Sequence, residues 1–144
     1  MKSILLTITT LFSFSLALNA QQTSLFDRDG EARAYIDYDK DATIFMWDGT
    51  PIAFLKKDGS DICIFGFNGS FMGWYEDGII YDRNGYVVGT KKGATNMLTK
   101  MERMKSMQRM TPVRPMTPVT PMQPMWKSSW SSTSLTELLY FGKK

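Results

Sequence analysis

Four glycine-centred hairpin signals constrain the fold of this chain more than any other feature. The segments LFDRDGEARAYI, IFMWDGTPIAFL, IFGFNGSFMGWY and IYDRNGYVVGTK align on Gly30, Gly49, Gly69 and Gly85, and each glycine follows Asp or Asn. Asp-Gly and Asn-Gly accept positive φ, and between β-forming residues they are the strongest short-range signal for a hairpin. The repeat predicts eight closely spaced strands with no room for helices between them.

Each repeat also has residue types fixed around its glycine. An aliphatic residue stands five positions before it, and an aromatic five positions after it in three copies, with Thr90 in the fourth. The aromatics four before or five after are Phe26, Phe45, Phe65, Tyr81, Tyr35, Phe54 and Trp74; the small residues four after are Ala34, Ala53, Gly73 and Gly89. With a two-residue loop, aliphatic and small residues lie opposite each other and the aromatics face the other side, whereas a bulge shifts the pairing and exchanges the faces. The small residues predict close approach of the repeats around a common axis.

We expect the short strands to close into a barrel. A single hairpin is marginally stable in water, so the four must share a core. A closed sheet also has no exposed edge. The sequence therefore predicts an all-β fold, a small pseudo-four-fold barrel of four hairpins over residues 24–92.

The same region resembles the 4-fold beta flower family. Residues 47–49 with 51–55 are similar to the family's WDG-x-P-[VI]-A-[YF]-L hairpin, and residues 66–69 with 72–74 to its [YF]-GFNG-x-x-[LM]-GW hairpin. The resemblance covers about residues 25–92 and implies a shallow, square barrel with a channel near the axis. No function is established for the family, so no catalytic residue is implied. The departures from its pattern are Thr90 and a charged first unit with Arg28, Glu31 and Arg33.

The N-terminus predicts export. Lys2, an apolar stretch to Leu18 and the small residue Ala20 form the pattern of a secretory signal peptide over residues 1–20. An apolar run of about 15 residues is short of the roughly 20 that span a bilayer. We therefore expect a periplasmic or extracellular protein.

The C-terminal third, residues 93–144, is a basic Met/Pro-rich tail. Residues 91–144 carry ten Lys/Arg against two Glu, whereas residues 21–90 carry six Lys/Arg against twelve Asp/Glu. Met97, Leu98, Met101 and Met104 have helical spacing, which predicts a helix over about residues 96–108. Such a basic tail either folds back on the acidic barrel or binds an anionic surface.

Residues 110–126 have a period of three. Prolines recur every third residue from Pro112 to Pro124, and Met or Val recurs with the same period. Polyproline II has three residues per turn, so this period gives straight faces. A flexible linker would not maintain an apolar face, and the pattern predicts a strap that runs along the barrel.

The last residues predict a short docked helix over residues 135–141. Ser134 and Glu137 form a capping box, and Gly142 is expected just past the end. A helix this short is not stable alone, so we expect it to cover an open face of the barrel. Trp126 and Trp130 are expected to anchor the approach.

The residues point to binding rather than catalysis. Histidine is absent, and the one cysteine, Cys63, lies in an apolar run; no nucleophile–base set stands out, and a carboxylate-dependent enzyme is a minor alternative. Asp37, Asp39 and Asp41 alternate as in calcium loops but lack the EF-hand glycine and glutamate. Copper on the methionines is disfavoured because valines share their positions, so no metal or cofactor is expected. No nucleic-acid partner is expected either.

Two hypotheses for function follow. In the first, an exported non-catalytic module holds an apolar or lipid-like ligand in the axial channel, in contact with the repeated aromatics. The alternative for these aromatics is that they form the core of the small all-β body, which needs large side chains. In the second, the basic Met/Pro-rich tail recruits a partner or binds a membrane surface. The sheet face that lines the channel is left open.

Overall fold

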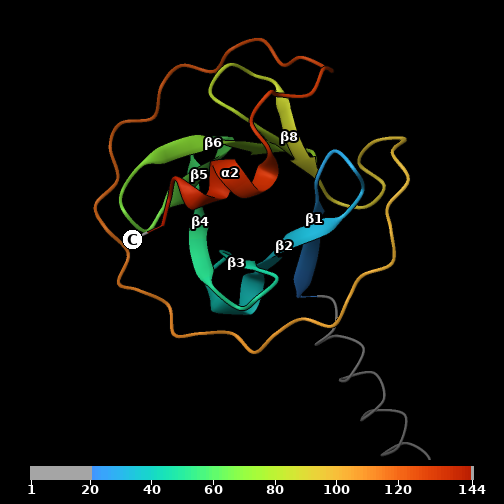
Figure 1. The fold of residues 1–144 in the computed structure, drawn as a ribbon. Coiled ribbons are helices and arrows are strands. Elements are labelled where there is room, and N and C mark those ends of the chain that lie inside the picture. Colours follow the sequence, from blue (N-terminus) through green and yellow to red (C-terminus); the bar gives the residue numbers. More distant parts are fainter. Residues whose placement is uncertain (1–20, 144) are drawn as a thin grey trace, which may run out of the picture.

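The computed structural model describes residues 21–143, which form a closed eight-stranded antiparallel barrel, a long extended segment and a short helix (Figure 1). Its elements are β1 (Gln22–Phe26), β2 (Ala32–Asp37), the 3-10 helix η1 (Tyr38–Lys40), β3 (Thr43–Met46), β4 (Pro51–Asp58), β5 (Asp61–Gly66), β6 (Phe71–Glu76), β7 (Ile79–Tyr81), β8 (Val87–Thr90) and α2 (Leu135–Tyr140). The strands pair in chain order, and Thr90 of β8 pairs with Phe26 of β1 to close the barrel. The predicted all-β barrel of four hairpins is confirmed. The predicted signal peptide lies outside the described residues.

All four predicted turns have the same hydrogen bonds. In the first, Gly30 N donates to Asp27 O at 3.0 Å and Asp27 N donates to Glu31 O at 2.9 Å. Gly30 has φ +77°, while the preceding Asp29 has no positive φ. This is a type I turn followed by a glycine bulge, so only the glycine needs the left-handed conformation. Each loop thus has three residues, in place of the two-residue loop considered from the sequence.

The pairing of aliphatic with small residues holds in spite of this bulge. Leu25 pairs with Ala34, Ile44 with Ala53, Ile64 with Gly73 and Ile80 with Gly89, and the register shifts directly beyond each of these pairs. The second shift compensates the turn bulge, so the prediction that a bulge exchanges the two faces is wrong. It also brings the residue before the small one to the inner face in three hairpins, where Ile52, Met72 and Val88 are buried.

The small residues make room for close neighbours, as predicted. A Cβ on Gly73 would lie 2.0 Å from Tyr81 O of the next hairpin, and one on Gly89 would lie 3.1 Å from the Leu135 side chain. The first contact is between successive repeats, and the second is with the C-terminal helix. The small positions therefore admit both the adjacent strand and α2.

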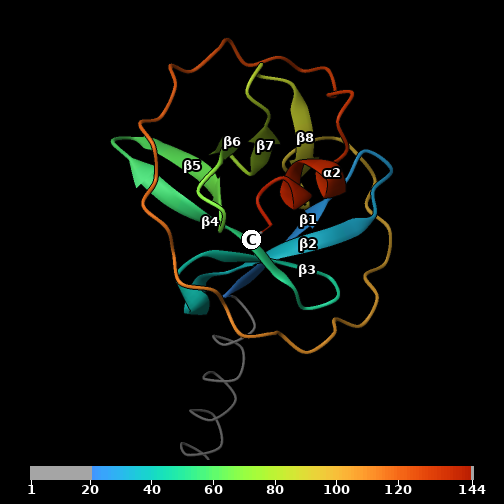
Figure 2. The ribbon, with the colours of Figure 1, turned by 60° about the vertical axis from the view of Figure 1, so that its left-hand side comes forward.

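Helix α2 closes one end of the barrel. Figures 1 and 2 show it lying across the opening at the end that carries the glycine turns. Ser134 Oγ accepts a hydrogen bond from Glu137 N at 3.1 Å, which confirms the predicted N-cap. Leu135 and Leu139 are completely buried in the aliphatic cluster of the barrel. The helix is therefore part of the core, as expected for one this short.

Gly142 has a different role from the predicted left-handed helix end. It has no positive φ, and the last helical residues keep right-handed geometry into Phe141. A Cβ on Gly142 would lie 2.6 Å from Gly66 Cα and 2.4 Å from Met72 Sδ. The glycine is thus needed for close contact with the third hairpin.

Residues 97–127, below called the strap, form an open ring around the barrel (Figures 1 and 2). The predicted helix over residues 96–108 is absent, because this part of the strap is extended as well. A helix would use its N–H groups internally, whereas Lys100 N donates to Gly30 O at 2.8 Å and Ser106 N donates to Trp47 O at 3.1 Å. The barrel turns thus take the hydrogen bonds that a helix needs.

Candidate functional site

The strap is in register with the four turns through a nine-residue repeat that the sequence reasoning missed. Leu98, Met107, Met116 and Met125 place their carbonyl oxygens beside Gly30, Gly49, Gly69 and Gly85 in that order. Two residues further on, Lys100, Arg109 and Lys127 donate their N–H groups to the first, second and fourth turn glycines at 2.8–2.9 Å. The signal was present in the sequence as basic residues nine or eighteen apart.

The third contact of this series is weak because of a proline. Pro118 occupies the donor position and has no N–H. There the strap stands further from the barrel, since a Cβ on Gly69 would lie 3.7 Å from Met116 O, against 2.0 Å between Gly49 and Met107 O. The strap is therefore hydrogen-bonded to the first, second and fourth turn glycines, and it contacts the third turn without this hydrogen bond.

The predicted ligand-contact aromatics lie on the outer wall of the barrel, beneath the strap. Phe26, Tyr35 and Phe45 belong to one cluster that packs against Met97, while Phe54, Phe65 and Trp74 belong to a second that packs against Trp126. Tyr81 stacks on Trp126 with ring centroids 4.4 Å apart. Neither cluster includes the aliphatic residues around the axis. Contact of these aromatics with a ligand stays a prediction.

The polar face of the strap is the one that faces this aromatic wall. Lys105 Nζ lies 4.6 Å from the centre of the Tyr35 ring, and the Arg114 guanidinium lies 4.5 Å from that of Phe54. Burial lowers the pKa of Arg114, but a guanidinium this basic keeps its charge. Gln108 Nε2 donates to Asp37 Oδ2 at 2.7 Å. Cation–π contacts and hydrogen bonds thus hold the inner face.

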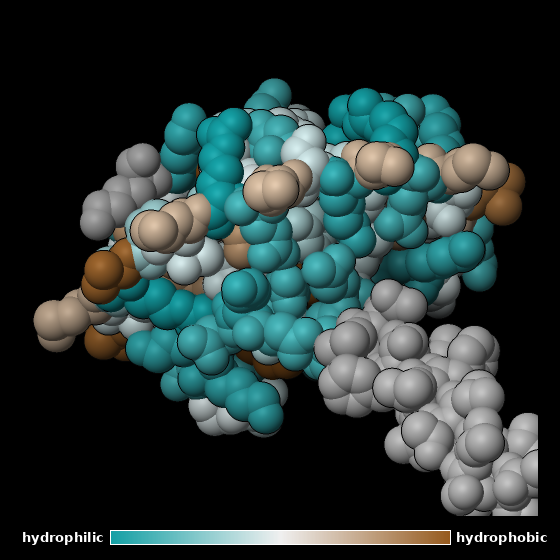
Figure 3. Space-filling model, turned by 90° about the horizontal axis from the view of Figure 1, so that it is seen from below, coloured by the Kyte–Doolittle hydropathy of each residue, from teal (hydrophilic) through white to brown (hydrophobic). Residues whose placement is uncertain are grey.

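The apolar face of the strap points away from the barrel. Figure 3 shows hydrophobic side chains standing in a row across an otherwise hydrophilic surface. We call this set the outward row; its side chains are 84–97% exposed and belong to Leu98, Met101, Met104, Met107, Met110, Val113, Met116, Val119, Met122 and Met125. The strap therefore runs along its own barrel as predicted, yet its apolar face is not what binds the barrel. Exposed apolar surface on this scale marks an interaction site.

The axis of the barrel is filled by aliphatic side chains. Leu25, Ile44, Ile64 and Ile80 are completely buried there, together with the leucines of α2. A ligand at that end of the axis would have to replace α2. The predicted channel position is thus occupied by the protein's own helix.

An open cleft lies beside α2 instead. It has a volume of about 400 Å³ and lies between the third and fourth turns. Phe71, Met72, Leu138 and Phe141 give it apolar walls, and Arg83 and Asn84 line its polar side. The Arg83 guanidinium donates through Nε and Nη2 to Phe71 O, which holds it beside the cleft.

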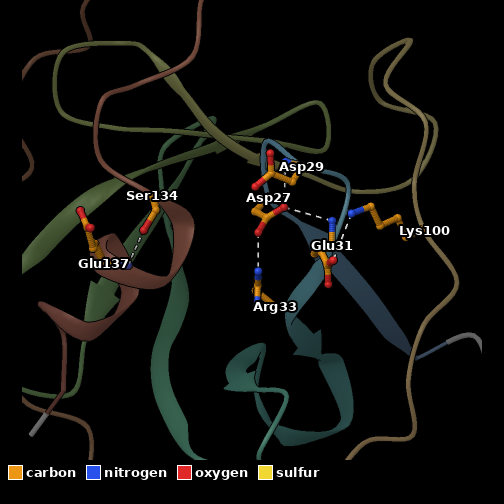
Figure 4. Close-up of polar contacts among 7 residues, drawn as sticks. All are labelled: Asp27, Asp29, Glu31, Arg33, Lys100, Ser134 and Glu137. Carbon is orange, nitrogen blue, oxygen red and sulfur yellow. Dashed lines mark hydrogen bonds and ion pairs between the residues drawn. The ribbon is translucent and has the colours of Figure 1, made fainter.

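The buried carboxylates are committed to turn structure. In the first hairpin, Asp27 Oδ1 accepts from Asp29 N and Glu31 N, and Oδ2 binds Arg33 Nε at 2.7 Å (Figure 4). This hydrogen bond raises the pKa of Arg33. Asp82 accepts from two backbone N–H groups in the same way. Of the charged departures of the first unit, Arg33 therefore stabilises the turn, whereas the Glu31 carboxylate binds Lys100 Nζ of the strap at 3.1 Å.

The residues considered for metal-binding and thiol chemistry, Asp37 and Cys63, each have a defined place in the fold. No three His, Cys, Asp or Glu side chains converge within residues 21–143. Asp37, the first residue of the calcium-like pattern, instead caps η1 by accepting from Asp39 N at 3.0 Å. Cys63 is completely buried under the strap near Thr120, and burial raises the pKa of its thiol. Asp37 thus stabilises a helix end, and the Cys63 thiol is part of a buried cluster.

Comparison with known proteins identifies a family. A family model described as 4-fold beta flower protein matches residues 23–139, which confirms the resemblance and extends it through the strap to α2. No curated protein and no solved structure matches the chain significantly. Within the described residues, no helix is long and apolar enough to cross a membrane.

Proposed function

Since the chain belongs to the 4-fold beta flower family, for which no activity is established, we propose a function from its own surface: a non-catalytic, exported module that docks on a lipid surface. The observation that carries the proposal is the outward row, ten large apolar side chains that the fold leaves almost fully exposed. A chain under no pressure to bind would gain stability by turning this face of the strap inward. Because the strap is fixed to the turns, the row is rigid before binding, which lowers the entropic cost of docking.

Basic residues beside the first half of the row favour an anionic lipid surface. Lys100, Arg103 and Arg109 are exposed between its members over residues 98–110. In the second half the equivalent positions are prolines, from Pro112 to Pro124. Apolar side chains that enter the acyl boundary and cations that meet phosphate groups are the two components of interfacial binding. We therefore assign the docking side to residues 98–110.

The experiment compares two triple substitutions in the protein without residues 1–20. Met101→Ser/Met104→Ser/Met107→Ser removes the apolar side chains next to the cations. Each partly inserted side chain contributes about 1 kcal/mol to the free energy of membrane binding, and this contribution is lost. Binding to phosphatidylglycerol vesicles, measured by co-sedimentation, should weaken about a hundredfold. Lys100→Gln/Arg103→Gln/Arg109→Gln should weaken it as well, at about 1 kcal/mol per cation near the surface.

Met116→Ser/Val119→Ser/Met122→Ser is the matched control, because these three residues are equally exposed and equally spaced but each follows a proline instead of a basic residue. The nearest cation of the strap, Arg114, is turned toward the barrel over Phe54. It should leave vesicle binding within about threefold of the unsubstituted protein. The assignment of the docking side is wrong if this control loses binding as much as the first variant. Absence of binding to both phosphatidylglycerol and phosphatidylcholine vesicles would refute lipid docking altogether.

The cleft beside α2 supports a second candidate function, the binding of a small apolar ligand at the rim rather than along the axis. Its volume of about 400 Å³ and its walls of Phe71, Met72, Leu138 and Phe141 are typical of small-molecule sites. Phe141→Ser should reduce binding of an apolar fluorescent probe such as anilinonaphthalene sulfonate about tenfold. Tyr140→Ser, on a neighbouring exposed residue outside the cleft, is the control, and equal loss in both variants would exclude this site.

A further inference from the structure

The methionines of the described chain divide into two environments. Seven belong to the outward row, and each of them is 87–97% exposed. Met46 and Met72 lie in the aliphatic cluster and are 6% and 3% exposed. Met97 is partly buried against the first aromatic cluster. The thioethers that reach water are therefore those that make no contribution to the core.

We propose that the seven methionines of the outward row are a site of reversible oxidation to methionine sulfoxide, which converts the row from apolar to polar without loosening the fold. The oxidant accepts two electrons from the sulfur and transfers one oxygen atom to it, and belongs to the peroxide or hypohalous acid class. With hydrogen peroxide, a lone pair of the sulfur attacks one peroxide oxygen and the O–O bond breaks. The sulfur is oxidised, and the other oxygen is reduced and leaves as water. Exposure of the sulfur controls the susceptibility of a methionine to this reaction.

The fold tolerates this modification because no sulfur of the outward row holds the strap in place. Backbone N–H groups of Lys100, Arg109 and Lys127 bind the turns, and the carbonyl groups of the row residues lie against the turn glycines. The inward contacts come from the polar face of the strap, such as Lys105 over Tyr35. An oxygen added to an outward sulfur therefore meets only water.

The consequence for binding rests on the proposed function. A sulfoxide is strongly polar, so oxidation of Met101, Met104 and Met107 opposes insertion into an acyl boundary in the same way as their substitution by serine. Val113 and Val119 do not react and keep the period of the row, but they lie in the half where prolines take the positions of Lys100, Arg103 and Arg109. Oxidation is thus expected to switch off lipid docking.

The test is peptide mapping by mass spectrometry of the folded protein during treatment with hydrogen peroxide. The seven methionines of the row should gain oxygen at rates within about threefold of free methionine, and Met46 and Met72 at least about tenfold more slowly. The melting temperature should fall by less than about 2 °C when the row is fully oxidised. Methionine sulfoxide reductases should restore the unmodified masses.

Two results would overturn the inference: oxidation of Met46 and Met72 as fast as the row, or unfolding that accompanies oxidation of the row. A variant with the seven methionines changed to leucine is the control for binding, since peroxide should weaken vesicle binding of the natural sequence and leave this variant unaffected. If the natural protein never binds vesicles but oxidises in the expected order, the proposed docking fails and the oxidation site stands.

Discussion

Replacement of Leu135 and Leu139 of α2 by alanine is expected to unfold the barrel or to lower its melting temperature by more than about 10 °C. Both leucines are 0% exposed and lie within the aliphatic cluster that fills the axis. Each Leu→Ala change in such a site costs about 2–5 kcal/mol, while the whole stability of a domain is typically about 5–15 kcal/mol. Thermal and guanidinium unfolding of the double variant measure the loss.

Glu137→Ala is the matched control for the leucines, since it lies on the exposed face of the same helix. The Ser134 cap binds the backbone N–H of residue 137, so the cap survives this substitution. We expect a change within about 0.5 kcal/mol, as is usual for surface positions. If the Leu135→Ala/Leu139→Ala variant had the same melting temperature as the natural sequence, α2 would not be part of the core.

Gly49→Ala is expected to destabilise the protein more than Gly69→Ala and to release the strap. Both glycines have nearly the same positive φ, +91° and +89°, so the backbone strain of about 1–2 kcal/mol is common to both variants. The difference lies in the strap: the new Cβ would be 2.0 Å from Met107 O in one case and 3.7 Å from Met116 O in the other. Displacement also breaks the bond from Arg109 N to Gly49 O, worth about 1 kcal/mol.

Limited proteolysis measures strap release separately from stability. Trypsin cleaves after Lys and Arg where no proline follows, and Lys105 and Arg109 are such sites in the affected part of the strap. Cleavage there should be at least about tenfold faster in Gly49→Ala than in Gly69→Ala, because local opening is less costly. Equal cleavage and equal melting of the two variants would contradict the role of turn–strap contact.

The parts of the fold that were predicted correctly depend on local chemistry. Asp-Gly and Asn-Gly turns, the alternation around them and the N-cap at Ser134 each involve residues close in sequence. The four turns and α2 therefore appear where the pattern places them. The pairing of Leu25 with Ala34 also follows, although it arises from two compensating bulges.

The parts that were predicted wrongly depend on the barrel as a binding surface. Methionines three residues apart are compatible with a helix or with polyproline II, and the turn carbonyls of Gly30, Trp47 and Gly49 decide for the extended form by accepting N–H groups of the strap. The direction of the faces is likewise set by the aromatic wall, where Lys105 and Arg114 lie over Tyr35 and Phe54. No local property of the tail contains this information.

The sequence alone determined the repeat, the family and the period of the strap. The tertiary structure decided what each face of the strap does. An isolated three-residue period has no inside or outside, and its apolar face would be expected to turn inward. The orientation is set by the barrel, whose turn glycines contact every ninth residue of the strap and whose aromatic rings between these turns bind cations of the strap. These contacts hold the polar face toward the barrel and leave the methionines of the outward row in water. That inversion makes the strap the candidate functional surface of the protein.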